Sequence, residues 1–278
     1  MIVGIDIGST TTKAVTIEGR KVIKKIKTKA SDAVTAATGA LGKIVLENGI
    51  KIGDINKIVI TGAGASKIKN DIFGIPTGRV NEIDAIGIGG MFLTGSDHQS
   101  MPEGSFNIII TNIGTGTVII EAGAKGIVHF GGTGVGGGTI LGLAKKLLPT
   151  AEFNDIIELA KTGKLNQVDL LLGDITDTSI SFLSGESTAS NFGKMLDTAS
   201  PNDIAIAIIN LVYQVIGVLS VFAAKARNSS RVIVTGNGSG NIIGQKIFAG
   251  ISGMYGIEFI YPEFAEYTTA IGAALSLA

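Results

Sequence analysis

The feature that most constrains the fold of this chain is a weak internal repeat. Residues 2–7 predict a short buried strand, which runs into the polar turn Gly8-Ser9-Thr10 and then into a second strand. Residues 106–111 predict a similar strand, which is followed by a Gly/Thr turn at 112–117 and another strand. Such hairpin tips expose several backbone N–H groups and form concave anion sites. Either tip alone is more typical of an ordinary turn. Two tips at the start of two similar halves predict two related α/β lobes that share one phosphate cleft.

The rest of the chain follows the same two-part organisation. A polar, turn-rich stretch at 95–104 is the best candidate for the junction. The first lobe is therefore predicted at 1–95 and the second at 105–265, with the last helix, 266–278, joining the first lobe. Further strands are predicted at 20–28, 57–61, 127–130, 231–235 and 257–261, and helices at 31–47, 84–93, 138–148, 152–162, 202–228, 240–254 and 266–277.

Composition excludes several classes of protein. The chain has 278 residues, no formal net charge and only 17% charged residues, so it lacks the electrostatic character of a nucleic-acid binder. It contains no cysteine, which excludes disulfides, thiolate metal sites and cysteine nucleophiles. The amino terminus does not show the pattern of a signal peptide. We therefore predict a cytoplasmic protein with no nucleic-acid partner.

Two further segments have ordinary explanations. A short basic stretch alternates with Val and Ile, as expected of an exposed edge strand; its lysines are Lys21, Lys24, Lys25, Lys27 and Lys29. Residues 205–224 are apolar and about as long as a membrane-spanning helix. Internal polar residues and the flanking α/β pattern favour a buried helix instead, so no membrane association is predicted. This helix could pack inside one lobe or across a two-fold dimer.

Three short motifs resemble those of a known superfamily. They are Asp6-x-Gly-x-Thr-x-x-Lys13, the Gly-Thr-Gly at 114–116, and a late strand that ends at Gly236. Together they resemble the superfamily of sugar kinases, heat-shock ATPases and actin. The resemblance implies two lobes of ribonuclease H-like (actin-like ATPase) fold around a cleft for ATP and Mg²⁺.

A sharper resemblance lies in the segments 81–85, 131–143 and 188–193, whose order and spacing are similar to those of bacterial type II pantothenate kinases. This resemblance implies ATP-dependent phosphorylation of the primary hydroxyl of pantothenate, the first step of coenzyme A biosynthesis, by a homodimer. One alternative is a kinase for another small hydroxyl compound, such as an amino sugar. Another is a non-kinase, ATP-dependent activator of a partner protein. Activators of radical dehydratases use cysteine-ligated clusters, and this chain has no cysteine.

The glycine-rich run at 131–138 also has a physical interpretation of its own. Six of its eight residues are glycine, and it leads into Thr139 and an apolar helical stretch. A helix amino terminus with little side-chain bulk suits a phosphate group. The run is not a P-loop, because no Gly-Lys-Ser/Thr follows. The alternative is close packing of helix against strand.

Two carboxylates are candidates for the chemistry. In the family that the chain resembles, the glutamate at Glu82 takes the proton from the acceptor hydroxyl, and a carboxylate within hydrogen-bond reach would also orient that hydroxyl. Asp6, at a strand end, would hold Mg²⁺ through water. The alternatives are a solvated loop carboxylate at Glu82 and a turn-bonding aspartate at Asp6. If 80–84 is extended, Asp84 shares a side with Glu82, but we favour Asp84 as the cap of a helix at 85–93.

The resemblance also assigns nucleotide contacts. Thr115 and Gly116 would bond phosphate oxygens, and Gly236 and Asn237 would line the adenine side. Lys13 either reaches phosphate or is a surface side chain. The full set of predicted nucleotide-binding residues is Asp6, Gly8, Ser9, Thr10, Thr11, Lys13, Thr115, Gly116, Gly137, Gly138, Thr139, Phe153, Gly236 and Asn237.

One position departs from the family pattern. Where the resembling kinases carry a substrate-associated Arg, this chain has His129. Glu82 and His129 are the predicted acceptor-binding residues. An imidazole lacks the permanent charge and planar fork of a guanidinium. A carboxylate held there would bind more weakly, by about 1–3 kcal/mol. The alternative is that His129 is an ordinary strand residue and that recognition lies elsewhere.

Overall fold

The computed structural model describes residues 1–29, 32–95, 107–176 and 184–277. Its two five-stranded sheets have the same topology: a central strand pairs with an antiparallel hairpin on one side and with two parallel strands on the other. The first sheet runs in the order β3 (Lys21–Lys29), β2 (Thr11–Glu18), β1 (Ile2–Ile7), β4 (Lys57–Thr61) and β5 (Thr77–Arg79). The second runs β8 (Gly126–Thr133), β7 (Thr117–Gly123), β6 (Ile108–Ile113), β11 (Arg231–Thr235) and β12 (Glu258–Ile260). The predicted fold class is confirmed.

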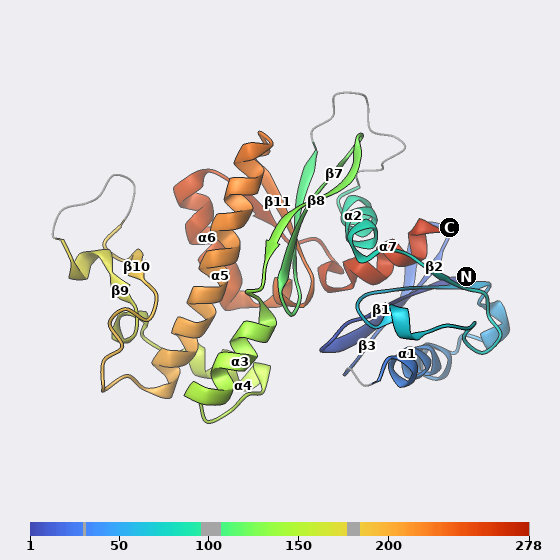
Figure 1. Ribbon diagram of the computed structural model, residues 1–278, viewed down its shortest axis with the longest axis horizontal. Coiled ribbons are helices and arrows are strands. Elements are labelled where there is room, and N and C mark those ends of the chain that lie inside the picture. The colour runs from blue at the N-terminus through green and yellow to red at the C-terminus, as the bar shows by residue number, and fades with distance from the viewer. Residues whose placement is uncertain (30–31, 96–106, 177–183, 278) are drawn as a thin grey trace.

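Helices cover both faces of each sheet. On the first sheet, α1 (Ala33–Asn48) packs on one face and α7 (Thr268–Ser276) on the other. On the second, α5 (Pro201–Ala226) and α2 (Glu82–Leu93) take the corresponding positions. α2 and α7 therefore lie against each other between the two sheets (Figure 1). The other helices of the second lobe are α3 (Gly137–Leu147), α4 (Phe153–Ala160) and α6 (Ile242–Tyr255).

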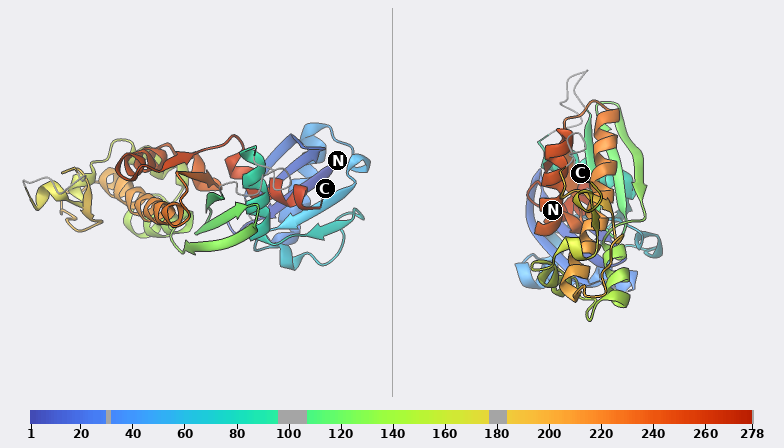
Figure 2. Two further views of the ribbon diagram at one scale, coloured as in Figure 1. Left: turned by 90° about the horizontal axis from the view of Figure 1, so that it is seen from above. Right: turned by 90° about the vertical axis from the view of Figure 1, so that its left-hand side faces the viewer.

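The contact between α2 and α7 depends on glycine. A Cβ at Gly272 would lie 1.7 Å from the Ala85 carbonyl oxygen, and one at Gly89 would lie 2.0 Å from that of Thr268. The two backbones approach each other so closely because neither glycine carries a side chain. The chain passes between the lobes at this crossing, and both termini lie on the side of the first lobe (Figure 2).

Most helix boundaries follow from capping residues. Asp32 begins α1, since its carboxylate accepts a hydrogen bond of 3.0 Å from the Thr35 N–H, and Gly49 ends it in the left-handed conformation. The sequence offers both Ser31 and Asp32 as caps of this helix. Ser31 lies outside the described residues, as does most of the predicted junction at 95–104.

The prediction for the start of α2 is wrong. Asn81 is the cap and accepts a hydrogen bond of 2.8 Å from the Ile83 N–H, so the helix begins at Glu82. Asp84 lies inside the first turn instead of capping it, and 80–84 is not extended. Asn caps as well as Asp does, and this earlier start places both carboxylates at the positive end of the helix dipole.

The small sheet of β9 (Leu170–Leu171) and β10 (Thr188–Ser190) was not predicted. It lies at the end of the molecule far from the first lobe (Figure 1). The fully buried Asp169 holds it, accepting hydrogen bonds of 2.8 Å from the Phe192 N–H, 2.8 Å from Asn210 Nδ2 and 3.1 Å from Asn191 Nδ2. These donors satisfy the buried charge, so the segment 188–193 is fixed against α5.

By length and composition alone, α5 could cross a membrane, but 61% of its apolar window is buried within the protein. Ile208, Val212 and Ile216 belong to the core of the second lobe. The interpretation of this segment as a buried helix is consistent with its packing.

Candidate active site

A cleft of about 1450 Å³ lies between the lobes. Its walls come from both repeats: the tip between β1 and β2, the tip between β6 and β7, and the short 3₁₀ helix η5 (Asn237–Gly240) after β11. α4 and the first turn of α6 complete the side that belongs to the second lobe. The volume exceeds the usual range for a small-ligand pocket.

The two hairpin tips meet across this cleft. The hydroxyls of Ser9 and Thr115 share a hydrogen bond of 2.7 Å, and those of Thr10 and Thr115 share one of 3.1 Å. Asn237 Nδ2 donates to Thr11 Oγ1 at 2.9 Å. Residues 106 positions apart in the sequence are thus in direct contact, and both tips face the same space.

A second element of the repeat is Thr-Gly-x-Gly, which occurs at 61–64 and at 235–238. Gly62 (φ 86°) lies so close to Asp6 that a Cβ would be 2.6 Å from its carboxylate oxygen. Gly236 (φ 82°) lies equally close to Asn112, where a Cβ would be 2.8 Å from the amide oxygen. Asn112 therefore occupies in the second lobe the place of Asp6 in the first, and it also lines the cleft. The internal repeat already aligns Asp6 with Asn112, but the sequence interpretation did not name Asn112 as a site residue and overlooked the repeated Thr-Gly-x-Gly.

A row of charged side chains crosses the first sheet beside the tips. Asp6 pairs in register with Lys13 on β2, and Lys13 pairs with Lys27 on β3. Residues in one register line point to the same face, and all three line the cleft. Asp6 and Lys13 are only 8% and 6% exposed, while Lys27 makes a 2.9 Å ion pair with Glu266. Lys13 is thus a cleft residue and not a surface side chain.

This burial changes the ionisation of the carboxylates. Burial raises the pKa of Asp6 to about 6, against the lowering effect of the Lys13 ammonium, and the Glu82 charge adds to the rise. Burial also raises the pKa of Glu82, and the Lys13 ammonium again opposes the rise. Burial lowers the pKa of Lys13, with Asp6 opposing.

The residues present fit a magnesium ion held mainly by water and phosphate. Among the described residues, no three His, Asp or Glu side chains gather into a cage for a metal. Mg²⁺ is commonly bound by one or two carboxylates together with substrate phosphates, and it keeps several of its waters. The buried, desolvated carboxylate of Asp6 has the chemistry of such a ligand, because a nearby cation would offset the cost of its burial.

The glycine-rich run braces the second tip. The N–H groups of Gly137 and Gly138, at the start of α3, donate to the carbonyls of Gly114 and Thr115, each at 2.9 Å. Gly137 lines the cleft, whereas Gly138 and Thr139 are not among the lining residues. This arrangement is that of the packing alternative, and a direct phosphate contact from these residues stays a prediction.

The remaining predicted nucleotide contacts lie in the second lobe. Gly236, Asn237 and Phe153 line the cleft, and Tyr213 fixes η5 by donating a hydrogen bond of 2.7 Å to the Gly238 carbonyl. Near them, Ile157 of α4 adds apolar surface. This part of the cleft suits the flat, apolar faces of a purine ring.

The structure separates His129 from the cleft lining. His129 is exposed on β8, where it pairs with Ile120 of β7. It follows Ile127 by two residues, and the Ile127 side chain lies against Gly87 of α2. Alternation along a strand places His129 on the side of β8 that faces α2, the helix that begins at Glu82. Lys27 and Lys29 on the edge strand β3 also line the cleft, and the sequence interpretation did not predict them as site residues. Their spacing of two residues in a predicted strand was the available signal that both side chains point to one face of the sheet.

The duplicated sheets, the α2–α7 crossing and the two tips that share a cleft define an actin-like ATPase fold. Solved structures agree: the activator of 2-hydroxyisocaproyl-CoA dehydratase from Clostridium difficile, with bound ADPNP, aligns with a TM-score of 0.65 and 20% identity over 99% of this chain and 93% of its own. A ROK family glucokinase from Streptomyces griseus, in complex with glucose and AMPPNP, aligns with a TM-score of 0.60 and 15% identity over 100% and 98%. At these identities the likeness is one of fold.

The family is defined by sequence. The model of the Fumble family matches residues 2–275, and the chain belongs to this family. A type II pantothenate kinase from Bacillus cereus is 34% identical over 243 residues, which cover 84% of this chain and 83% of the relative. A type II pantothenate kinase from Staphylococcus aureus is 27% identical over 280 residues, or 98% of each chain. The resemblance to type II pantothenate kinases is confirmed.

Proposed function

We propose that this protein is an ATP-dependent kinase that phosphorylates the primary hydroxyl of pantothenate, the first step of coenzyme A biosynthesis. The observation that carries the proposal is the contact between Ser9 and Thr115, which brings two hairpin tips with exposed backbone N–H groups to one cleft. Family membership and the pantothenate kinase relatives support the choice of acceptor.

We assign each wall of the cleft a role in binding ATP. Backbone N–H groups of the two tips would bind the triphosphate of ATP from opposite sides. The purine would lie between η5 and α4, near Asn237 and Phe153. Lys13 would offer its ammonium to phosphate oxygens as negative charge shifts during transfer. Because the hydroxyls of Ser9 and Thr115 bond to each other here, they would exchange that bond for phosphate oxygens when nucleotide binds.

Glu82 would act on the acceptor. Its carboxylate, at the start of α2, would accept a hydrogen bond from the pantothenate hydroxyl, orient the oxygen towards the γ-phosphorus and take its proton. The raised pKa of Glu82, caused by burial, makes it a better proton acceptor than a fully solvated carboxylate. Asp6 would hold Mg²⁺ through water, and the ion would neutralise phosphate charge.

Transfer of labelled γ-phosphate tests this proposal. With Mg·ATP, the protein should phosphorylate pantothenate in preference to amino sugars such as N-acetylglucosamine. Preference for a sugar would instead support the alternative acceptor, for which the exchange of Arg for His129 is the motivating observation. ATP hydrolysis without any acceptor would favour an ATP-dependent activator.

We also propose that the protein is a cytoplasmic homodimer. α5 carries an apolar stripe at helical spacing on the side away from the core: Leu211, Val215 and Val218 are half-buried, and Phe222 is 57% exposed. An unpaired apolar helix face of this kind suits a two-fold contact with a second copy.

A further inference from the structure

A row of lysine side chains on one face of β3 extends beyond the nucleotide cleft. Because side chains alternate along a strand, Lys25, Lys27 and Lys29 point to the same face, and Lys24 points to the other. Lys27 and Lys29 line the cleft. Lys25 lines a second cavity of about 370 Å³, within the size range of small-ligand sites.

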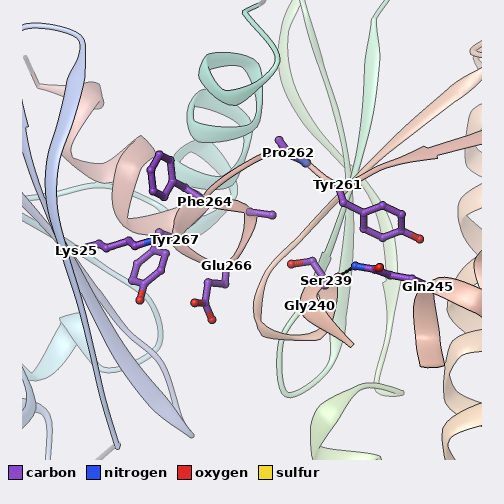
Figure 3. A pocket seen from close by; sticks show the side chains of 10 residues that line it. Lys25, Ser239, Gly240, Gln245, Tyr261, Pro262, Phe264, Glu266 and Tyr267 are labelled. Carbon is purple, nitrogen blue, oxygen red and sulfur yellow. Dashed lines mark hydrogen bonds between the residues drawn. The ribbon is translucent and has the colours of Figure 1, made fainter. Parts of the chain in front are cut away.

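This second cavity lies between the lobes, behind η5. Figure 3 shows Lys25, Phe264, Glu266 and Tyr267 on one side of the cavity and Ser239, Gly240, Gln245 and Tyr261 on the other. Gly240 also lines the nucleotide cleft, so η5 is a shared wall with one ligand space on each side.

Three aromatic side chains contribute to the wall of this cavity. The chain has only four tyrosines and no tryptophan, yet two of the tyrosines, Tyr261 and Tyr267, line this space together with Phe264. Lys25 Nζ lies 4.4 Å from the ring centroid of Phe264 and 5.4 Å from that of Tyr267, in cation–π geometry. The ammonium is thus held in place at the edge of an aromatic surface.

The polar groups of the cavity are also fixed. Gln245 Nε2 donates a hydrogen bond of 2.8 Å to the Ser239 carbonyl. The 2.9 Å ion pair with Lys27 offsets part of the negative charge of Glu266, and Lys25 supplies the positive charge of the cavity wall.

The backbone of Phe264 is also unusual, with a φ of 62° in the left-handed region that residues with side chains rarely adopt. Such conformations are concentrated at ligand clamps and switches.

We propose that this cavity is a second binding site, separate from the nucleotide cleft, for a small monoanion with a flat aromatic body. The ring would lie against Tyr261 and Phe264, and the anionic group would meet the ammonium of Lys25. An organic cation is the poorer ligand because it would face Lys25 directly.

Binding of 2-naphthoate to the full-length protein tests the site. Calorimetry and saturation-transfer NMR would be run with the cleft filled by Mg²⁺ and a non-hydrolysable ATP analogue. We expect 2-naphthoate to bind under these conditions, and its neutral amide, 2-naphthamide, to bind at least about tenfold more weakly, since it loses a charged hydrogen bond.

Matched variants on neighbouring positions locate the site. Lys25→Met should weaken 2-naphthoate binding by about tenfold or more, whereas Lys24→Met, on the opposite face of the same strand, should leave it unchanged. Displacement of 2-naphthoate by the ATP analogue would place it in the cleft and overturn the proposal. The proposal would also be overturned if Lys25→Met and Lys24→Met lost equal affinity for 2-naphthoate, or if 2-naphthoate and 2-naphthamide bound equally well. It would likewise be overturned if 2-naphthoate did not bind to the wild-type protein.

Discussion

For the carboxylate of Asp6, the needs of ligand binding and of protein stability are opposed. Its position in the cleft suits a cation and phosphates, but its burial beside Glu82 makes the charged form costly while no ligand is bound. Lys13 offsets only part of this cost, since burial also lowers the pKa of Lys13. Such a conflict between stability and charge is common at functional sites.

Replacing Asp6 should therefore stabilise the protein and inactivate it. Its folded pKa of about 6 lies above the ordinary value of 3.8 for an aspartate, so stability is lost as pH rises from about 4 through 6. Asp6→Asn should raise the free energy of unfolding of the nucleotide-free protein at pH 8 by up to about 3 kcal/mol, and hardly at all near pH 3.5. Urea denaturation at both pH values measures this. The exposed Asp197→Asn is the control, and a variant less stable than wild type at pH 8 contradicts the interpretation.

Glu82 is the proposed catalytic base. Glu82→Gln keeps the shape of the side chain but cannot take a proton, so kcat for pantothenate should fall by about 10²–10⁴-fold. Affinity for the ATP analogue should be unchanged within about twofold, because only the acceptor side is altered. Asp84→Asn, in the same helical turn, is the matched control. Near-normal turnover by Glu82→Gln would show that another group is the base.

At the scale of the elements, close backbone contacts decide where helices lie. α7 can pack against α2 because Gly272 brings no side chain to the carbonyl of Ala85. A single methyl group there has no space, whereas glycines on exposed helix surfaces have no such restriction. Gly250 of α6 is one of these, since a Cβ there would meet nothing within 4 Å.

The same substitution should thus have opposite effects at these two positions. Gly272→Ala should lower the free energy of unfolding by about 1–3 kcal/mol, because it overpacks the helix crossing. Gly250→Ala should raise it by about 0.5–1 kcal/mol, as expected for alanine in a helix. Chemical denaturation of the two variants measures both changes. A Gly272→Ala variant as stable as Gly250→Ala would mean that the crossing adjusts without cost.

For the whole molecule, the arrangement of two equivalent lobes explains why two hairpin tips face the cleft. The pairs Gly62 with Asp6 and Gly236 with Asn112 are the same construction in each half. The halves differ in what they add: among the described residues, α4 and the small sheet held by Asp169 belong to the second half and have no counterpart in the first. The added elements belong to the predicted purine side of the cleft and to the end of the molecule beyond α5.

The apolar stripe of α5 predicts the quaternary structure. Val215→Asp together with Phe222→Asp should convert a dimer into a monomer, because charges would be buried without partners at the contact. Light scattering coupled to size-exclusion chromatography measures the mass directly. Leu46→Asp, at an exposed apolar position on α1 in the other lobe, is the control. A wild-type protein that is monomeric at micromolar concentration would contradict the proposed dimer.

The sequence alone determined the class of fold and the position of both tips. Strand, glycine and hydroxyl residues recur in order, and local patterns of this kind depend on neighbours along the chain. Turns such as Gly8-Ser9-Thr10 were readable for the same reason, and the cap of α1 was narrowed to Ser31 or Asp32. The start of α2 was misread because two candidate caps three residues apart, Asn81 and Asp84, compete, and local pattern does not rank them.

Only the tertiary structure decided which residues meet. The contact of Ser9 with Thr115, the burial of Lys13 and the place of Lys27 in the cleft all depend on segments distant in sequence. The same holds for Gly137 and Gly138, whose N–H groups bond to the second tip. Hydrogen bonds and desolvation act over a few ångströms in space, and the sequence does not record which distant groups come that close.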